Sequence, residues 1–222
     1  MIAKPALADA TVDELRLSLA PEIAEAAIFD GWSAEAVRAA AARLGVNPDA
    51  ASFAFSGGAM DMIAAWVARI DADMTAALPK ERIGNLPIRE RIRALIQFRL
   101  DALAGREEAL RRALAIMAMP QNAPAALRLG WHSADAMWRL AGDTATDYNH
   151  YTKRMTLGSI YAATLAVFAQ DQSDYHADTR AFLERRIGDV MQFEKAKGRL
   201  LKPREEQFSL ARLLGRLRYP AR

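Results

Sequence analysis

Apolar residues recur at every third or fourth position along most of this chain. That period matches the turn of an α-helix, while the strict alternation typical of strands is missing and Ala, Leu, Arg and Glu dominate. The pattern therefore predicts an all-α protein. We expect helices at about 11–29, 33–45, 47–56, 58–78, 88–103, 106–119, 124–140, 147–170 and 176–198, and a last helix after Pro203.

Polar residues and glycines mark the ends of these helices. Ser33 can cap the second helix and Gly45 can end it, while Asn47 or Asp49 can open the third. Three short helices followed by longer ones indicate a small head on a larger bundle. We therefore divide the chain into a head, 1–57, a bundle, 58–200, and a tail, 201–222.

Three features of the head stand out: the stretch Gly31-Trp32-Ser33-Ala34-Glu35-Ala36-Val37, the turn Leu44-Gly45-Val46, and the aromatic residues Phe53 and Phe55. Together they resemble the helix-turn-helix-like head of TetR-type regulators, which leaves a ligand-sensing transcription regulator as one alternative. The charges argue against it, because residues 1–57 hold four basic and eight acidic residues and no Lys or Arg lies between Val46 and Gly58. We expect no nucleic-acid partner and a head that serves as scaffold.

The most distinctive segment reads Ala134-Asp135-Ala136-Met137-Trp138-Arg139-Leu140-Ala141-Gly142-Asp143-Thr144-Ala145-Thr146-Asp147-Tyr148-Asn149-His150-Tyr151-Thr152-Lys153-Arg154. It resembles the signature of the coenzyme Q nine family, lipid-binding accessory proteins of ubiquinone biosynthesis in mitochondria and alphaproteobacteria. The segments 119–124, 171–173 and 182–187 agree as well, so the resemblance extends over most of the chain.

This resemblance implies a TetR-like fold, a homodimer, bound lipid or isoprenoid quinone precursor, and contact with a membrane surface. It also implies a protein partner, the di-iron demethoxyubiquinone hydroxylase. The surface patch for that partner would include Met137, Asp147, His150, Tyr151 and Arg154. The family often has a bulky aromatic residue where this chain has His150.

The residues of the same segment also allow a purely structural interpretation. Gly142 can end one helix, and Asp143 or Asp147 can cap the next, so capping and recognition both stay open for these two acids. Trp131 and Trp138 lie seven residues apart on one helix face, which is more typical of a core than of a site.

Apolar side chains of the bundle form its core, but helical bundles also bind ligands between their helices. Flexible Met side chains suit an adaptable apolar pocket. Together with the resemblance, this composition predicts a lipid cavity. We expect lipid contacts from Phe98, Leu114, Met117, Leu165 and Phe168.

The net positive charge of the chain comes from its C-terminal end, because residues from Lys195 to Arg222 include nine basic and two acidic ones while the rest of the chain is mildly acidic. An apolar stripe follows the helical spacing and basic residues lie opposite it, a pattern typical of a helix on a membrane surface. Docking on the same or a sister subunit is the alternative. The expected membrane-binding residues are Phe208, Leu210, Arg212, Leu213, Leu214, Arg216 and Leu217.

Sequence motifs for catalysis are missing. There is no cysteine, no P-loop, no G-x-G-x-x-G and no G-x-S-x-G, and the three histidines lack metal-ligand spacing to one another. We expect no enzyme, no metal and no cofactor other than bound lipid. Residues 1–10 lack a signal pattern and no apolar run reaches the roughly 20 residues of a membrane span. We expect a cytoplasmic, peripherally membrane-associated protein in bacteria, and the matrix side of the mitochondrion for eukaryotic relatives.

Overall fold

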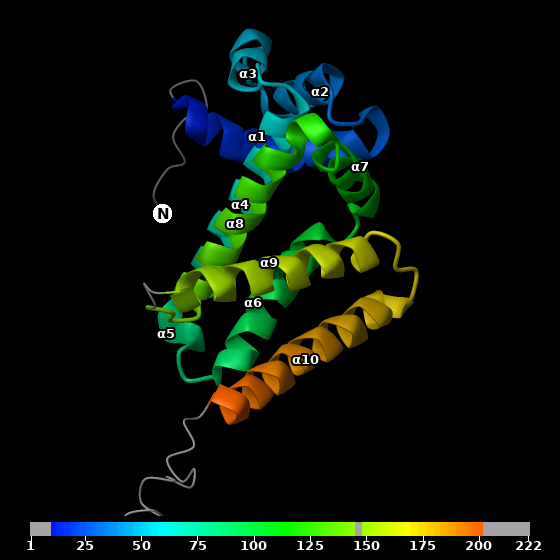
Figure 1. Cartoon of the computed structure of the whole chain (residues 1–222). Coiled ribbons are helices and arrows are strands. Elements are labelled where there is room, and N and C mark those ends of the chain that lie inside the picture. Colours follow the sequence, from blue (N-terminus) through cyan, green and yellow to red (C-terminus); the bar gives the residue numbers. More distant parts are fainter. Residues whose placement is uncertain (1–9, 145–147, 202–222) are drawn as a thin grey trace, which may run out of the picture. The chain divides into compact units, whose positions relative to one another are not determined.

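The computed structural model describes residues 10–144 and 148–201, and its secondary structure within these ranges is helical (Figure 1). The helices are α1 (Val12–Asp30), α2 (Ala34–Leu44), α3 (Pro48–Ala54), α4 (Ala59–Ala77), α5 (Lys80–Ile83), α6 (Ile88–Leu103), α7 (Glu107–Met117), α8 (Ala123–Leu140), α9 (Tyr148–Phe168) and α10 (Ala177–Leu201), with 3₁₀ turns η2 (Pro120–Asn122) and η3 (Asp174–His176). The predicted all-α fold is confirmed. The one-turn helix α5 and the two 3₁₀ turns were not predicted.

Side-chain caps fix the first helices where the sequence predicts them. The Thr11 hydroxyl accepts the amide of Glu14, and the Thr11 amide donates back to the Glu14 carboxylate, which holds the pKa of Glu14 below its ordinary value. The Ser33 hydroxyl accepts the amide of Ala36, and the side chain of Asn47 caps α3. Gly45 ends α2 in the left-handed region, at φ 67°.

The chain divides into two compact units, residues 1–184 and 185–222, and the division falls inside α10. In the second unit an ion pair joins Arg186 and Asp189 at 3.1 Å. The boundaries predicted at residues 57 and 200 stay predictions. The expected membrane-binding residues lie outside the described residues: Phe208, Leu210, Arg212, Leu213, Leu214, Arg216 and Leu217.

Helices α1, α2 and α3 pack together, and α1 also packs on α4 and α7 (Figure 1). Alanines on α2, such as Ala36 and Ala40, are fully buried and permit close approach to α1. At the junction with the bundle the rings of Trp32 and Trp66 lie 5.2 Å apart, and the Trp32 indole N–H donates to the carbonyl of Ala109 at 3.0 Å. The head is thereby anchored on the bundle helices α4 and α7.

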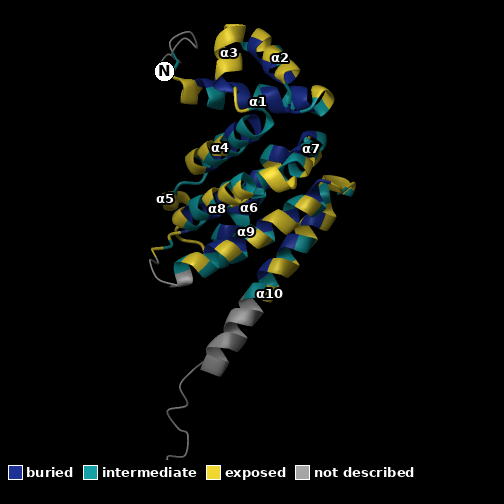
Figure 2. Cartoon of the chain, turned by 45° about the horizontal axis from the view of Figure 1, so that its top comes forward, coloured by how far each residue is buried: buried dark blue, intermediate teal, exposed yellow. Residues whose placement is uncertain are grey.

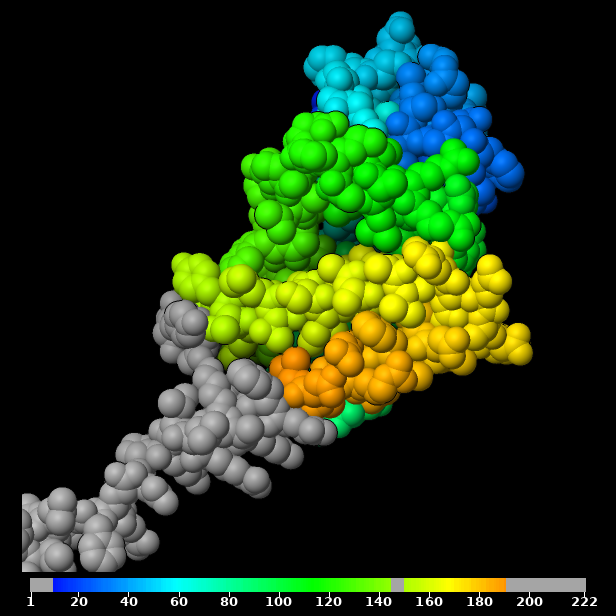
Figure 3. All heavy atoms as spheres, turned by 45° about the vertical axis from the view of Figure 1, so that its right-hand side comes forward, coloured from blue at the N-terminus to red at the C-terminus, as the bar shows by residue number. Residues whose placement is uncertain are grey.

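The bundle core is built around α4, which packs on α6, α7 and α8, while α9 packs on α8 and α6. The buried faces of these helices show as dark blue stripes in Figure 2, and the space-filling view shows α7, α8 and α9 together on one face of the first unit (Figure 3). Fully buried core side chains include Ile63, Met74, Leu95, Ile96 and Leu100. This core holds the corner between α8 and α9, where the distinctive segment lies.

Candidate functional site

The corner between α8 and α9 begins at a glycine that ends α8. Gly142 has φ 91°, a conformation that side-chain-bearing residues rarely adopt. A Cβ there would also lie 3.1 Å from the guanidinium of Arg91, which donates to the neighbouring carbonyl of Ala141 at 2.8 Å. The predicted role of Gly142 as a helix stop is confirmed. Asp147 lies outside the described residues.

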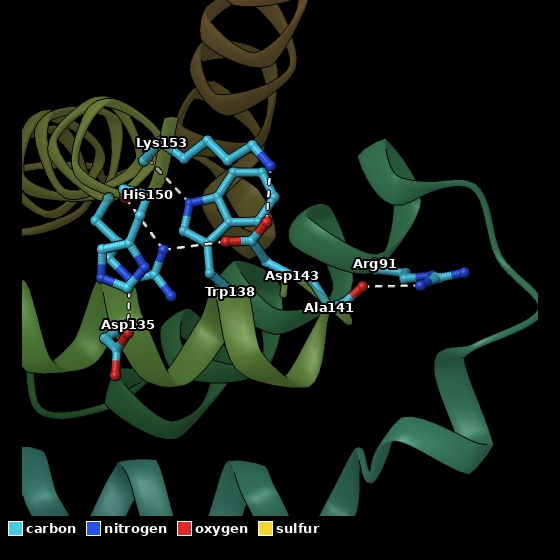
Figure 4. A network of polar contacts seen from close by, with 8 residues as sticks. Arg91, Asp135, Trp138, Ala141, Asp143, His150 and Lys153 are labelled. Atoms are coloured by element: carbon cyan, nitrogen blue, oxygen red, sulfur yellow. Dashed lines mark hydrogen bonds and ion pairs between the residues drawn. The ribbon is translucent and has the colours of Figure 1, made fainter. Parts of the chain in front are cut away.

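Arg154 lies buried beneath this corner, with 3% of its surface exposed. Its guanidinium pairs with Asp135 of α8 at 2.6 Å and with Asp143 at 3.0 Å, and it donates to the carbonyl of His150 at 3.1 Å (Figure 4). The prediction that Arg154 contacts a partner directly is wrong, because two carboxylates hold its side chain between α8 and α9. Arg154 is instead a positioning residue, which ties α9 to α8 and to the loop that joins them.

Asp143 lies between two cations. Its carboxylate accepts from Lys153 at 2.7 Å as well as from Arg154, and only 4% of its side chain is exposed. The Lys153 ammonium lies 5.4 Å from the centre of the Trp138 ring, and the Trp138 indole donates to the Lys153 carbonyl at 2.9 Å (Figure 4). These contacts fix the first turns of α9. The Asp143 carboxylate thus belongs to an ion-pair network that the sequence does not reveal. The capping and recognition roles of Asp143 stay predictions.

Met137 is fully buried on the face of α8 that also buries Ser133, Ala134 and Leu140. The prediction that Met137 belongs to a partner surface is therefore wrong. Its position follows the helical period, since these residues recur three or four positions apart and pack into the bundle.

Three rings meet where the first turn of α9 lies against α8. The rings of Trp131 and Tyr151 lie 5.9 Å apart, and His150 lies 5.2 Å from Tyr151 and 6.3 Å from Trp131. Tyr151 is 59% exposed, Met155 lies one helical turn further along α9, and Leu127 lies one turn before Trp131 on α8; both are largely exposed. We call Leu127, Trp131, His150, Tyr151 and Met155 the aromatic patch. It suits the binding of a protein surface, because aromatic anchors with exposed apolar side chains on the same helix faces are typical of interfaces.

The sequence predicted only part of this patch. Tyr151 and His150 were expected there, Trp131 was expected in the core and is half-buried, and Leu127 and Met155 were not expected in the patch. A sequence pattern could have indicated Leu127 and Met155. Each lies four residues from an aromatic residue, Trp131 or Tyr151, and this spacing places each pair on one helix face.

The five residues expected to contact lipid lie on three helices of the bundle. Phe98 of α6, Leu114 and Met117 of α7, and Leu165 of α9 are half-buried, while Phe168 is buried with its ring centre 4.2 Å from that of His176. Their lipid contacts stay predictions. A surface hollow of about 300 Å³ lies at a different place, between α4 and α8, and is lined by Thr75, His132, Asp135, Ala136, Arg139 and Leu140.

A second buried arginine lies inside the bundle. Arg99 of α6 is 1% exposed, pairs with Asp71 of α4, donates to the hydroxyl of Ser133 at 3.1 Å and lies over the ring of Tyr161 at 4.8 Å. Burial by itself lowers the pKa of Arg99, but Tyr161 and Asp71 outweigh this effect and raise the pKa above its ordinary value. The burial of Arg99 could have been predicted from its position, because it lies seven residues after Ile92 on the apolar stripe of α6.

Within the ranges that the structure describes, histidines, aspartates and glutamates do not gather in groups of three that could hold a metal ion. In the same ranges no single helix is both long and apolar enough to cross a bilayer, although α3 and α4 meet that criterion jointly across a bend of 89°.

Comparison with known proteins agrees with this architecture. Residues 123–194, which contain α8, α9 and the aromatic patch, match the COQ9 family model. The chain is 38% identical over 168 residues to the ubiquinone biosynthesis protein COQ9, mitochondrial, of Rattus norvegicus, covering 72% of this chain and 54% of that protein. The corresponding protein of Homo sapiens is 36% identical over 168 residues, covering 72% and 52%. The chain therefore spans about half the length of the curated relatives it matches.

Among solved structures the chain is similar to a TetR transcriptional regulator from Nitrosomonas europaea ATCC 19718. The TM-score is 0.64 at 25% sequence identity, over 80% of this chain and 98% of that one. Both expectations drawn from the sequence, the TetR-like fold and the family of the distinctive segment, are confirmed. The chain carries a domain of the COQ9 family, built on a TetR-like all-α fold.

Proposed function

We propose that this chain is a non-catalytic accessory protein of ubiquinone biosynthesis, which presents an isoprenoid quinone precursor to the di-iron demethoxyubiquinone hydroxylase. The names of the curated relatives support the pathway. The aromatic patch supports a protein partner, since it lies within the residues that match the family model. That patch is the observation that carries the proposal.

The buried ion pairs explain why the patch suits recognition. Arg154 and Asp143 fix the start of α9, and the carbonyl of His150 accepts from the same guanidinium. Tyr151 is therefore presented on a helix whose position is already set before binding. Such preorganisation favours affinity, because less conformational freedom is lost when the partner docks.

The partner contact is tested with purified hydroxylase and the full chain, by measuring the dissociation constant with biolayer interferometry. Tyr151→Ala should weaken binding by about 2 kcal/mol, roughly thirtyfold, because exposed aromatic anchors dominate interface energies. Phe53→Ala is the matched control, since Phe53 is an aromatic residue of the head that is 70% exposed. Unchanged binding by Tyr151→Ala, or an equal loss with Phe53→Ala, contradicts the proposed partner surface.

Lipid binding is the second part of the proposal. A polyprenyl tail is costly to expose to water, at ~0.8 kcal/mol for each CH₂, so a carrier must cover it. We expect the cover to include Phe98, Leu114, Met117, Leu165 and Phe168. Mass spectrometry of lipid extracted from the purified protein should find an isoprenoid, and an extract without one removes the carrier role.

Membrane contact and assembly follow the same proposal. The basic amphipathic pattern of residues 203–222 supports a reversible contact with a membrane surface. Deleting these residues should weaken liposome flotation, and unchanged flotation refutes the assignment. We also propose a homodimer, which light scattering on the purified chain tests by its mass.

A transcription regulator is the rival function, favoured by the likeness to a TetR regulator. The charges of the head oppose it, because Arg16, Arg38 and Arg43 all pair with carboxylates of this chain. The helix α3 exposes Phe53 and Asp49 rather than cations. DNA binding needs several cations at phosphates and falls steeply with salt. A gel shift at low ionic strength should show no retention, and salt-sensitive retention favours the rival.

A further inference from the structure

The loop between α5 and α6 exposes three consecutive apolar residues. Leu86 and Ile88 are 41% and 42% exposed, and Pro87 between them is exposed too, whereas Ile83 just before the loop is buried. Single apolar residues are common on protein surfaces, but an exposed run needs a function to explain it. We call Gly84–Ile88 the apolar loop.

Hydrogen bonds hold the apolar loop in one conformation. Arg91 donates to the carbonyls of Gly84 and Leu86, the latter at 2.8 Å, and also to the carbonyl of Ala141 after α8 (Figure 4). The Leu86 amide donates to the Ile83 carbonyl at 3.0 Å, and a Cβ on Gly84 would lie 2.7 Å from the Lys80 carbonyl. The Leu86 amide and the carbonyls of Gly84 and Leu86 thus bond within the protein, while the side chains of Leu86 and Ile88 stay exposed.

Basic residues flank the apolar loop. Residues 80–93 hold five basic and two acidic residues, and Lys80 and Arg82 are exposed. Arg89 and Arg93 share Glu184, but Arg82 and Arg91 donate to backbone carbonyls. Within the described ranges no carboxylate pairs with Lys80, Arg82 or Arg91, unlike the arginines of the head. The flank therefore keeps an uncompensated positive charge.

We propose that the apolar loop is a membrane-contact site, in which Leu86 and Ile88 enter the acyl region of an anionic bilayer and Lys80 and Arg82 lie at the lipid phosphates. Charge complementarity selects an anionic surface, and the apolar tip selects one with a hydrocarbon interior. A soluble phosphate matches the cations but leaves the apolar tip in water. The inference rests on the chemistry of this loop and does not depend on the hydroxylase or on the tail.

Labelling at one position tests insertion in the full chain. Because the sequence has no cysteine, Leu86→Cys can carry a single NBD fluorophore. Vesicles of phosphatidylcholine with phosphatidylglycerol should shift its emission to the blue, and lipids brominated in the acyl chain should quench it. The same label at Phe53→Cys in the head should show neither effect. An aqueous spectrum at Leu86 while the protein floats with the vesicles overturns the proposal.

The flanking charge is tested with matched double variants. Lys80→Gln with Arg82→Gln should lower affinity for the anionic vesicles about 25-fold, at about fivefold for each cation. Arg38→Gln with Arg43→Gln removes the same charge from the head and should leave affinity within about twofold, since both arginines are already paired. Equal losses in both double variants overturn the proposal, because they would reflect net charge alone.

Two further arms separate the alternatives. Inorganic phosphate without vesicles should leave the Leu86 label unchanged, and a spectral change with phosphate alone overturns the proposal by assigning the cations to a soluble anion. Hydroxylase affinity should stay unchanged in the Lys80 and Arg82 double variant. A parallel loss of hydroxylase affinity would make this a protein contact and overturn the membrane assignment, whereas a failure of the Tyr151 test leaves the loop assignment intact.

Discussion

The head and the corner between α8 and α9 both contain arginine ion pairs, but the pairs have different consequences. In the head, Arg38 and Glu35 are 58% and 63% exposed, and such pairs contribute only about 0–1 kcal/mol. At the corner, the side chains of Arg154 and Asp143 are 2% and 4% exposed. The exposed ion pairs of the head neutralise its arginines but do not hold helices in place. The buried ion pairs at the corner, in contrast, set the position of α9.

The exposed aromatic residues of the two regions differ in the same way. In the head, Phe29 lies in the last turn of α1, while Phe53 lies next to Ala54, whose carbonyl accepts from Arg16 near the start of α1. They are therefore far apart, as single exposed apolar residues often are. At the corner, Trp131, His150 and Tyr151 are in ring contact. This contrast is why we place the partner surface at the corner and a scaffolding role at the head.

The largest expected effect breaks the buried network. Arg154→Ala leaves Asp135 and Asp143 without their shared cation, which should cost about 3–5 kcal/mol of unfolding free energy. Arg139→Ala is the matched control, because Arg139 pairs with the same Asp135 but is 71% exposed, and it should cost less than about 1 kcal/mol. Urea denaturation measures both, and equal costs would contradict the positioning role of Arg154.

Just after α9, the carboxylate of Asp171 is bound by neutral hydrogen-bond donors instead of cations. Burial raises the pKa of Asp171, but the hydroxyls and amides of Ser173 and Thr179 outweigh it and hold the pKa well below its ordinary value of 3.8. The stability from these bonds is therefore present above that value and lost as the pH falls through the lowered pKa.

Removing the carboxylate gives a testable pH dependence. Asp171→Ala should cost roughly 1–3 kcal/mol at neutral pH, since the donors lose a charged acceptor. The difference between the two proteins should shrink as the solution is acidified below the ordinary pKa. Chemical denaturation across this pH range measures the difference, and a constant difference at every pH contradicts the assignment.

A smaller effect tests the junction between head and bundle. Trp32→Phe loses the indole N–H that donates to the Ala109 carbonyl, and this buried bond should be worth about 1–2 kcal/mol. Hydroxylase affinity should be unchanged at temperatures where the variant stays folded. Loss of affinity without loss of fold would show that the head takes part in recognition.

The smallest expected effect belongs to the patch itself. Tyr151→Ala should change the unfolding free energy by no more than about 0.5 kcal/mol, because the side chain is mostly exposed. Differential scanning fluorimetry measures the change. A large loss of melting temperature would make Tyr151 a structural residue.

The sequence predicts the helices well because helix ends are local. Ser33, Asn47 and Gly142 act through their own backbone and near neighbours, so their roles can be predicted without tertiary contacts. The helix α5 and the 3₁₀ turns escape prediction because elements this short show no periodicity.

The site is harder to predict, because it depends on contacts between distant residues. Arg99 and Arg154 are charged and would ordinarily be exposed, and only their pairing with Asp71 or with Asp135 and Asp143 permits burial. The family resemblance indicates a segment for the site but does not show which side of α9 faces out. Tyr151 was therefore placed correctly on the surface, while Arg154, three residues later, was not.

Hydrogen–deuterium exchange of the full chain, with and without the hydroxylase, tests the central claim most directly. Peptides that contain Leu127–Trp131 and His150–Met155 should gain protection when the hydroxylase is added, and peptides from residues 12–54 should not. Protection confined to the head, with the peptides of the aromatic patch unchanged, would contradict the account.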